Sequence, residues 1–336
     1  MSDKTKSFIQ LAVENHKLTH ATIEVLTECN CRCIHCYIPE HNSYGLSFET
    51  LVRIFKELRE IGVFEITFTG GEFFIRRDAC DILRAARDLG FNINLFSNIS
   101  LLTPTIVEEI AGLYLCNVSC TVFSLNSQIH DSITGVPGSL AKILSSIEMI
   151  RKHPIPLEIK TILMKANANA YIDLIPFCAE RKIKYLATTN IFPKQNYDML
   201  PSEMLLSGDE LKKVLSDIDG IRDFDKPRGV TDNDYICNSI HHSIYVDCKG
   251  DVYPCNLLPL KLGSLLEESL SNIWMDKSRF CGVLDYRWGD IQECASCKSK
   301  QFCYRCTGLA YAATNSLLEK DESNCVFSNA RIELFT

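Results

Sequence analysis

Hydrophobic and polar positions follow two alternating periods from residue 22 to about residue 192. Short runs rich in β-branched and aromatic residues alternate with longer stretches in which apolar residues recur every three or four positions. The short runs predict six strands, at residues 22–27, 64–69, 91–96, 118–124, 157–163 and 183–191. Because helical patterns separate them, we expect an α/β fold with a parallel sheet and helices outside it.

The longer stretches carry helix boundary signals. Ser47 is a suitable N-cap for a helix that stops at Gly62, and Pro104 occupies the first helical position of another. Further helical patterns cover residues 78–90, 103–113, 139–153 and 169–182. Six strand–helix units are fewer than the eight of a closed barrel, so we predict a partial, open (β/α)6 barrel with its site at the carboxyl ends of the strands.

The remaining chain divides into a connection and a tail. Residues 195–236 are polar, with one helical piece at 207–219, and a cysteine-rich segment follows. A length of 336 residues suits a barrel-sized domain and a smaller one. We therefore expect a barrel at 1–194, a connecting segment at 195–236 and a small cysteine-rich domain at 237–336.

Composition and charge narrow the class of protein. Hydrophobic residues make up 46% and charged residues 23%, which is typical of a soluble globular protein. The net charge is −7 without a basic run interleaved with aromatics, so we expect no nucleic-acid partner. No apolar stretch approaches the ~20 residues of a membrane span, and the first ten residues lack the apolar segment of a secretory signal. We expect a cytoplasmic protein without a membrane partner.

The 17 cysteines are unevenly distributed. Four fall in residues 29–36 and nine in 237–325, whereas Cys80, Cys116, Cys120 and Cys178 are scattered among predicted helices and strands. In a reducing cytoplasm, clustered thiols more often bind metal than form disulfides. The two groups therefore predict metal sites, and the scattered cysteines predict ordinary buried side chains.

The first group follows the first predicted strand. Cys29, Cys33 and Cys36 have the spacing C-x3-C-x2-C, with Cys31 inside the first gap. This pattern resembles the radical S-adenosylmethionine (SAM) superfamily, including His35 in the slot of an aromatic ring before the last ligand. The resemblance implies a [4Fe–4S] cluster whose fourth iron is chelated by SAM, and reductive cleavage of SAM to a 5′-deoxyadenosyl radical. It also implies a radical SAM partial barrel.

A second motif, Gly70-Gly71-Glu72, follows the second predicted strand. The glycines allow close backbone approach to a ligand, and the carboxylate suits an ammonium group. The motif resembles the superfamily's contact with the methionyl amino group of SAM, although Phe73 replaces the usual proline. A tight strand–helix turn is the alternative explanation of the glycines.

Two weaker motifs follow the third and fourth predicted strands. Ser97 and Asn98 stand where the superfamily often has Thr-Asn-Gly, which implies contacts with SAM. Ser124 and Asn126 stand in a stretch that resembles a ribose-contacting Ser-Leu-Asp-Gly, with Asn126 in place of the acid. Ordinary loop polarity is the alternative for both pairs.

The tail contains Cys237-x12-Gly250-x4-Cys255, then C-x2-C-x5-C-x2-C, then a last cysteine. This resembles the SPASM domain, with the gap before Cys306 one residue short. The resemblance implies two auxiliary [4Fe–4S] clusters, one held by Cys237, Cys255 and Cys306 and the other by Cys294, Cys297, Cys303 and Cys325. The fourth position of the first cluster is then open, or filled by Cys248, Cys281 or Asp247. Zinc is the alternative metal.

The SPASM resemblance implies an enzyme that abstracts hydrogen from a residue of a ribosomally made peptide, giving a crosslink, thioether or epimer. It also implies a low-potential donor such as flavodoxin or ferredoxin. We expect leader recognition by a separate protein or by the barrel itself. There are three alternatives: a sulfatase-type protein maturase, a small-molecule enzyme acting on a tetrapyrrole or sugar, and a non-catalytic zinc scaffold. The first is less well supported, because Asn256 stands in the place of a catalytic aspartate. No catalytic acid or base is predicted, because polarity alone marks His130, His241, His242 and Tyr245.

Overall fold

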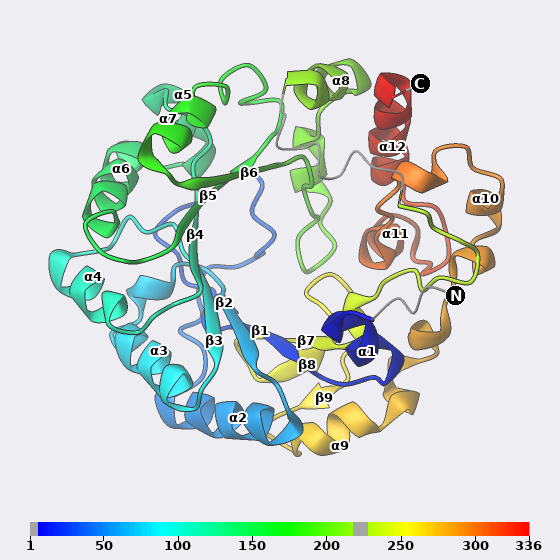
Figure 1. Ribbon diagram of the computed structural model, residues 1–336, viewed down its shortest axis with the longest axis horizontal. Helices are drawn as coiled ribbons and strands as arrows, with labels where there is room; N and C mark the ends of the chain where they lie inside the picture. The colour runs from blue at the N-terminus through cyan, green and yellow to red at the C-terminus, as the bar shows by residue number, and fades with distance from the viewer. Residues whose placement is uncertain (1–5, 218–227, 336) are drawn as a thin grey trace.

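The computed structural model describes residues 6–217 and 228–335 and contains the predicted parallel sheet. Six strands pair in parallel in chain order, so that the sheet curves into the open barrel of Figure 1. They are β1 (His20–Glu24), β2 (Glu65–Thr69), β3 (Asn92–Phe96), β4 (Asn117–Thr121), β5 (Leu157–Ile162) and β6 (Lys184–Thr188). All six predicted strands are present, with ends shifted by up to a few residues.

The helices cover the outside of this sheet (Figure 1). They are α2 (Phe48–Ile61), α3 (Ala79–Asp88), α4 (Pro104–Ala111), α6 (Ser139–Ile150) and α7 (Leu174–Arg181). Ser47 caps α2 by accepting the Thr50 N–H, and Gly62 ends it with a φ of 106°, which favours glycine. The sequence did not predict α5 (Ser127–Thr134) as a helix.

Alternation along the strands separates an apolar outside from a polar inside. Phe68 of β2 faces outward, and its ring packs against Phe55 of α2 with centroids 5.7 Å apart. Thr67, its neighbour in the strand, faces the barrel interior, where its hydroxyl lies 2.9 Å from the His20 ring. The packed helices stabilise the barrel, and its interior retains the polar groups that a site needs.

The tail continues the barrel sheet. Strand β7 (Ser243–Val246) pairs in parallel with β1, β8 (Asp251–Tyr253) is antiparallel to β7, and β9 (Gly263–Ser264) is antiparallel to β8. On the open side of the barrel, α12 (Glu322–Phe335) packs against α8 (Gly208–Asp217), as Figure 1 shows. The predicted helical piece at 207–219 corresponds to α8, and its last two residues lie outside the described residues. The tail therefore contributes structure on both sides of the barrel opening.

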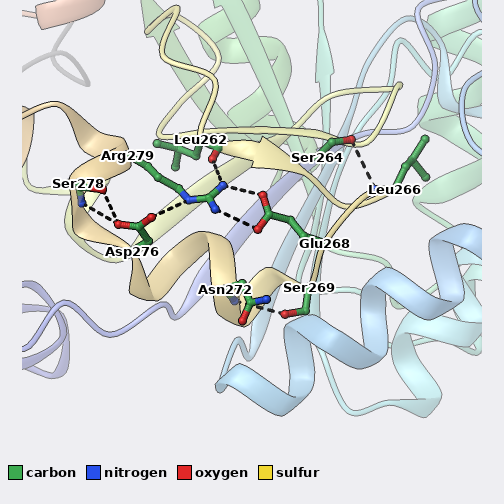
Figure 2. A network of polar contacts seen from close by, with 9 residues as sticks. All are labelled: Leu262, Ser264, Leu266, Glu268, Ser269, Asn272, Asp276, Ser278 and Arg279. Carbon is green, nitrogen blue, oxygen red and sulfur yellow. Dashed lines mark hydrogen bonds and ion pairs between the residues drawn. The ribbon is translucent and has the colours of Figure 1, made fainter.

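Short elements complete the chain. They are α1 (Phe8–Glu14), α9 (Leu270–Met275), α10 (Gln292–Ala295) and α11 (Thr307–Thr314), with several 3-10 turns. Figure 2 shows how Arg279 holds the segment around α9, after β9: its guanidinium donates to both oxygens of Glu268, at 2.6 and 3.0 Å, and to Asp276 at 3.1 Å. This bidentate pairing fixes the segment around α9. Within the described ranges, every helix is too short or too polar to cross a bilayer.

Candidate active site

The loop that follows β1 carries the first cysteine group. The Arg32 guanidinium donates to the backbone carbonyls of Cys29 and Cys31, at 2.6 and 2.7 Å, and so keeps the loop turned on itself. The Arg32 N–H donates to the Thr134 carbonyl at 2.8 Å, at the end of α5. Helix α5, which the sequence did not predict, therefore supports the loop that presents the cysteines.

The thiols of this loop interact with one another. A hydrogen bond with Cys31, and then burial, raise the pKa of the Cys29 thiol. A hydrogen bond with Cys29 lowers the pKa of Cys31, but one with Cys33 and burial raise it to about 12 overall. Burial also raises the pKa of Cys36, with a smaller contribution from the charge of Cys29. Such thiols lose their protons readily only beside a cation, so the loop fits a cationic iron centre.

Geometry distinguishes a cluster from a single ion at this loop. In the described part of the chain, no three or more His, Cys, Asp or Glu side chains are placed to hold one metal ion. A [4Fe–4S] cluster has a different requirement, because each thiolate binds its own iron and the ligands surround a larger space. The three cysteines of the motif share one loop, as that arrangement requires, and their role as ligands remains a prediction.

The Gly-Gly-Glu motif packs directly against the cysteine loop. The N–H groups of Gly71 and Glu72 donate to the carbonyls of Leu26 and Glu28, each at 2.9 Å. A Cβ atom on Gly71 would lie 2.0 Å from the Glu28 oxygen, and one on Gly70 would lie 2.2 Å from the Leu26 oxygen. In this structure, the glycines allow close approach of the two loops to each other, which places Glu72 beside the cysteines.

The structure brings Glu72, Ser97 and Asn98 together, as the sequence predicted. Glu72 is 0% exposed, and its carboxylate accepts the Ser97 hydroxyl and the Asn98 N–H, each at 2.7 Å. Burial raises the pKa of this carboxyl group. The Asn98 amide donates to Asn30 in the cysteine loop at 2.8 Å. The three residues therefore form one hydrogen-bonded polar cluster next to the cysteines, and their contacts with SAM remain a prediction.

The other predicted cofactor contacts lie nearby, with clear structural roles. The Asn126 side chain caps α5 by accepting the Gln128 N–H at 2.9 Å, and the buried Ser124 hydroxyl accepts the Asn126 N–H at 3.0 Å. The His35 ring packs edge-on against Phe123 at 5.1 Å, and burial lowers its pKa to about 4. His35 is therefore neutral at pH 7. The ribose contact by Asn126 remains a prediction.

The tail cysteines form the two groups that the SPASM resemblance implies. In the first, burial raises the pKa of Cys255 to about 12 and of Cys306 to about 11, and Cys237 contributes to both. In the second, burial raises the pKa of Cys303 and Cys325 to about 11, with contributions from neighbouring thiols. Cys294 interacts in the same way with Cys297. Each group therefore gathers thiols that a cationic cluster would stabilise as thiolates.

Two of the candidates for a fourth ligand of the first tail cluster, Asp247 and Cys248, line the same cavity as Cys255. The Cys248 thiol lies 3.7 Å from the Ser43 hydroxyl, and Cys281 is exposed. Asp247 accepts two N–H groups of its own loop, each at 2.9 Å. Asp321, which the sequence analysis did not single out, is 4% exposed and accepts the Cys306 N–H at 3.3 Å. It lies between Cys306 and Cys325, at a position that the motif does not specify, so the cysteine spacing would not have identified it.

A cavity of about 570 Å³ connects the two cysteine regions. Thr27, just before the cysteine motif, and Cys255, of the first tail group, both line it. Residues 193–197, after β6, form another part of its wall. The cavity therefore adjoins both cysteine-bearing regions; of the predicted cluster ligands, Cys255 lines it, whereas Cys29, Cys33 and Cys36 do not.

Comparison with known families agrees with the fold and the cysteine pattern. Residues 23–175 match the radical SAM superfamily, and residues 237–307 match SPASM, an iron–sulfur cluster-binding domain. The chain belongs to the radical SAM superfamily and carries a SPASM domain. It is an enzyme, and its cofactors are SAM and [4Fe–4S] clusters.

Several characterised relatives span most of the chain. The AdoMet-dependent heme synthase of Methanosarcina barkeri is 25% identical over 90% of this chain and 95% of its own length. The PqqA peptide cyclase of Bradyrhizobium diazoefficiens is 22% identical over 93% and 87%. The sporulation killing factor maturation protein SkfB of Bacillus subtilis is 26% identical over 75% and 63%.

A solved structure shares the fold. The structure of Streptococcus suis SuiB bound to its precursor peptide SuiA has a TM-score of 0.75 and 17% identity, over 94% of this chain and 79% of SuiB. This likeness confirms the predicted combination of a partial barrel and a SPASM domain.

Proposed function

We propose that this enzyme cleaves SAM reductively and abstracts hydrogen from a residue of a ribosomally synthesised peptide, as a step in its post-translational modification. The cavity that begins at the end of β1 and reaches Cys255 supports this proposal, because a substrate residue there would lie next to both cysteine-bearing regions. Relatives named as a peptide cyclase and a maturation protein support the substrate class.

The residues of the first site have distinct roles in this proposal. Cys29, Cys33 and Cys36 hold the SAM-binding cluster, which supplies the electron that breaks the sulfonium bond when it is bound. Glu72, with Ser97 and Asn98 around it, receives the ammonium of SAM, because a buried carboxylate is stabilised by a cation. Chelation of an open iron, as the superfamily resemblance implies, would hold the cofactor beside these residues.

The tail would hold two auxiliary clusters at the cysteine groups described above. Cys255 of the first tail group lines the cavity, so a cluster held there would suit acceptance of an electron from the substrate after hydrogen abstraction. A low-potential protein of the flavodoxin or ferredoxin type would reduce the SAM-binding cluster. A separate leader-binding protein, or the barrel itself, would present the peptide. We place the reaction in the cytoplasm, where the thiols remain reduced.

Anaerobic reconstitution tests this function. Enzyme with about twelve iron atoms per chain, four for each of three clusters, is incubated with SAM, reductant and the short peptides encoded beside its gene. We expect one peptide to stimulate 5′-deoxyadenosine formation and to change in mass or stereochemistry. The Cys29→Ala/Cys33→Ala/Cys36→Ala variant is the control for cluster-dependent turnover. Wild-type enzyme that no peptide stimulates would contradict the proposal.

A tetrapyrrole substrate is the second candidate. The match to the Methanosarcina barkeri heme synthase, over 90% of this chain and 95% of the relative, favours it. The same assay with tetrapyrroles in place of peptides separates the two, because each predicts stimulation by one class of compound. A sulfatase-type maturase is less well supported, because the amide of Asn256 cannot accept a proton.

A further inference from the structure

A buried carboxylate outside the predicted motifs faces the cavity. Glu24, the last residue of β1, is 2% exposed, and its Oε2 accepts the Tyr245 hydroxyl at 2.6 Å. The Gln195 amide donates to the same oxygen at 3.3 Å and to the Tyr245 oxygen at 2.9 Å. All three side chains line the cavity. They come from β1, β7 and the segment after β6, so tertiary folding alone brings them together.

The sheet register fixes this group inside the barrel. Thr22 pairs with Thr67 of β2 on one side and with Tyr245 of β7 on the other. Because Thr67 faces the interior and strand side chains alternate, Tyr245 and Glu24 face the interior as well. The Gln195 N–H donates to the carbonyl of Tyr37 at 2.8 Å, and Tyr37 directly follows Cys36. The group is therefore held beside the predicted SAM-binding cluster.

The carboxylate has hydrogen-bond donors but no cationic partner. Among the described residues, no Lys, Arg or His forms an ion pair with Glu24. Burial, its largest effect, raises the pKa of Glu24 above its usual range, and the Tyr245 and Gln195 hydrogen bonds oppose that rise only in part. A buried, uncompensated carboxylate in a cavity is the arrangement expected of a functional proton acceptor.

Glu24 also supplies the cavity with a proton acceptor, which Asn256 cannot provide. In sulfatase-type maturases, which this tail resembles, the residue at that position is thought to serve as the base, and an amide cannot do so. Asn256 and Glu24 line the same cavity: Asn256 follows Cys255 of the tail, and Glu24 precedes the first cysteine loop. A base is therefore present in the cavity, supplied by the barrel.

We propose that Glu24 accepts a proton from the substrate after hydrogen abstraction, with Tyr245 and Gln195 as positioning residues. The 5′-deoxyadenosyl radical takes one hydrogen atom, Glu24 takes one proton and an auxiliary cluster takes one electron. The substrate thus loses two hydrogen atoms in a net two-electron oxidation. This outcome corresponds to a crosslink, a thioether or an unsaturated bond, and it excludes epimerisation, in which a hydrogen atom returns to the substrate.

The test compares Glu24→Gln, which keeps the size and hydrogen bonding of the side chain, with wild type and with Glu65→Gln. Glu65 is a matched control, because it lies in the barrel sheet at the opposite, amino-terminal end of β2. The probe is the precursor peptide that stimulates 5′-deoxyadenosine formation by wild-type enzyme, so this arm rests on the proposed function. Assays in D2O record 5′-deoxyadenosine, product and product mass.

For Glu24→Gln we expect 5′-deoxyadenosine to form at about the wild-type rate, while oxidised product falls by about 100-fold or more, as for loss of a general base. Tyr245→Phe should also lower the amount of product formed per 5′-deoxyadenosine, but by less than Glu24→Gln does. Glu65→Gln should leave this ratio unchanged. A merely structural role would lower both quantities together and would overturn the proposal. A wild-type product of unchanged mass apart from one solvent deuterium would also overturn it, because a hydrogen donor would then act.

A second measurement needs no substrate. The infrared difference spectrum between wild type and Glu24→Gln isolates the Glu24 carboxyl band at neutral pH. An ionised carboxylate supports the proposal, whereas a protonated group cannot accept a proton and overturns it, even if no peptide stimulates turnover. The titratable groups that influence or face Glu24 include Cys36, Tyr37, Tyr245, Asp247, Cys248 and Tyr253.

Discussion

Replacing Gly71 with alanine should separate the two loops that form the SAM site. The added Cβ would lie 2.0 Å from the Glu28 oxygen, whereas real Cβ atoms stay at least 3.0 Å from such atoms, so the loops must move apart by about 1 Å. That movement would break the two 2.9 Å hydrogen bonds between them. Their loss costs about 1–3 kcal/mol together, and crowding costs about 1–3 kcal/mol more.

We therefore expect Gly71→Ala to lower the free energy of unfolding by about 2–6 kcal/mol. Urea denaturation followed by circular dichroism measures this loss, and iron content and SAM binding should fall with it. Gly112→Ala is the matched control, because its Cβ would meet the nearest atom at an ordinary 3.6 Å and its φ is −77°. If Gly71→Ala is no less stable than Gly112→Ala, the close approach of the loops does not hold the site together.

Three further predictions concern the charged and thiol groups. The Cys29→Ala/Cys33→Ala/Cys36→Ala variant should lose about a third of the iron and all SAM cleavage, measured by iron analysis and 5′-deoxyadenosine, whereas Cys80→Ala should lose neither. Glu72→Gln should weaken SAM binding by about 10- to 100-fold in calorimetry, since hydrogen bonds to charged groups contribute about 1.5–3 kcal/mol; unchanged affinity would exclude an ammonium contact. Burial raises the folded-state pKa of Glu24 above its unfolded value, so wild-type stability should fall as the pH rises from the unfolded through the folded pKa. A glutamine side chain does not titrate, so the Glu24→Gln variant lacks this loss of stability. The urea midpoint of the variant minus that of wild type should therefore increase over the same pH interval. A difference that stays constant with pH would contradict the raised pKa of Glu24.

The strands and most helices could be predicted because their signals are local. Apolar periodicity marks the strands, and the Ser47 cap and Gly62 stop mark the ends of α2. Helix α5 was missed because its sequence was interpreted as a ligand-contacting stretch, although Asn126 is a good N-cap. Strand β7 could not be assigned to the barrel, because its pairing with β1 joins residues more than 200 positions apart.

The residues of the candidate site also divide into those that a local motif marks and those that only the folded structure brings together. Fixed spacings marked both cysteine groups and Glu72; the structure joins Glu72 to Ser97 and lets thiols within each cysteine group interact, while their roles as ligands stay predictions. Glu24 carries no motif, and its partner Tyr245 lies 221 residues away in the chain, so only the sheet register reveals the pair. Polarity alone had marked Tyr245, and its burial against Glu24 gives it a defined neighbour.

The parallel pairing of β7 with β1 makes the two halves of the chain interdependent. An excised fragment of residues 1–194 would expose the unpaired edge of β1. Unpaired strand edges can pair with a second copy, so the fragment would be prone to strand exchange or aggregation. The loop that begins where β1 ends would then lose its anchor on that side. Truncation at the tail boundary should therefore yield a damaged barrel rather than a minimal enzyme, because the backbone ladder of β1, β7 and β8 joins the strand before the first cysteine group to the strand before Cys255.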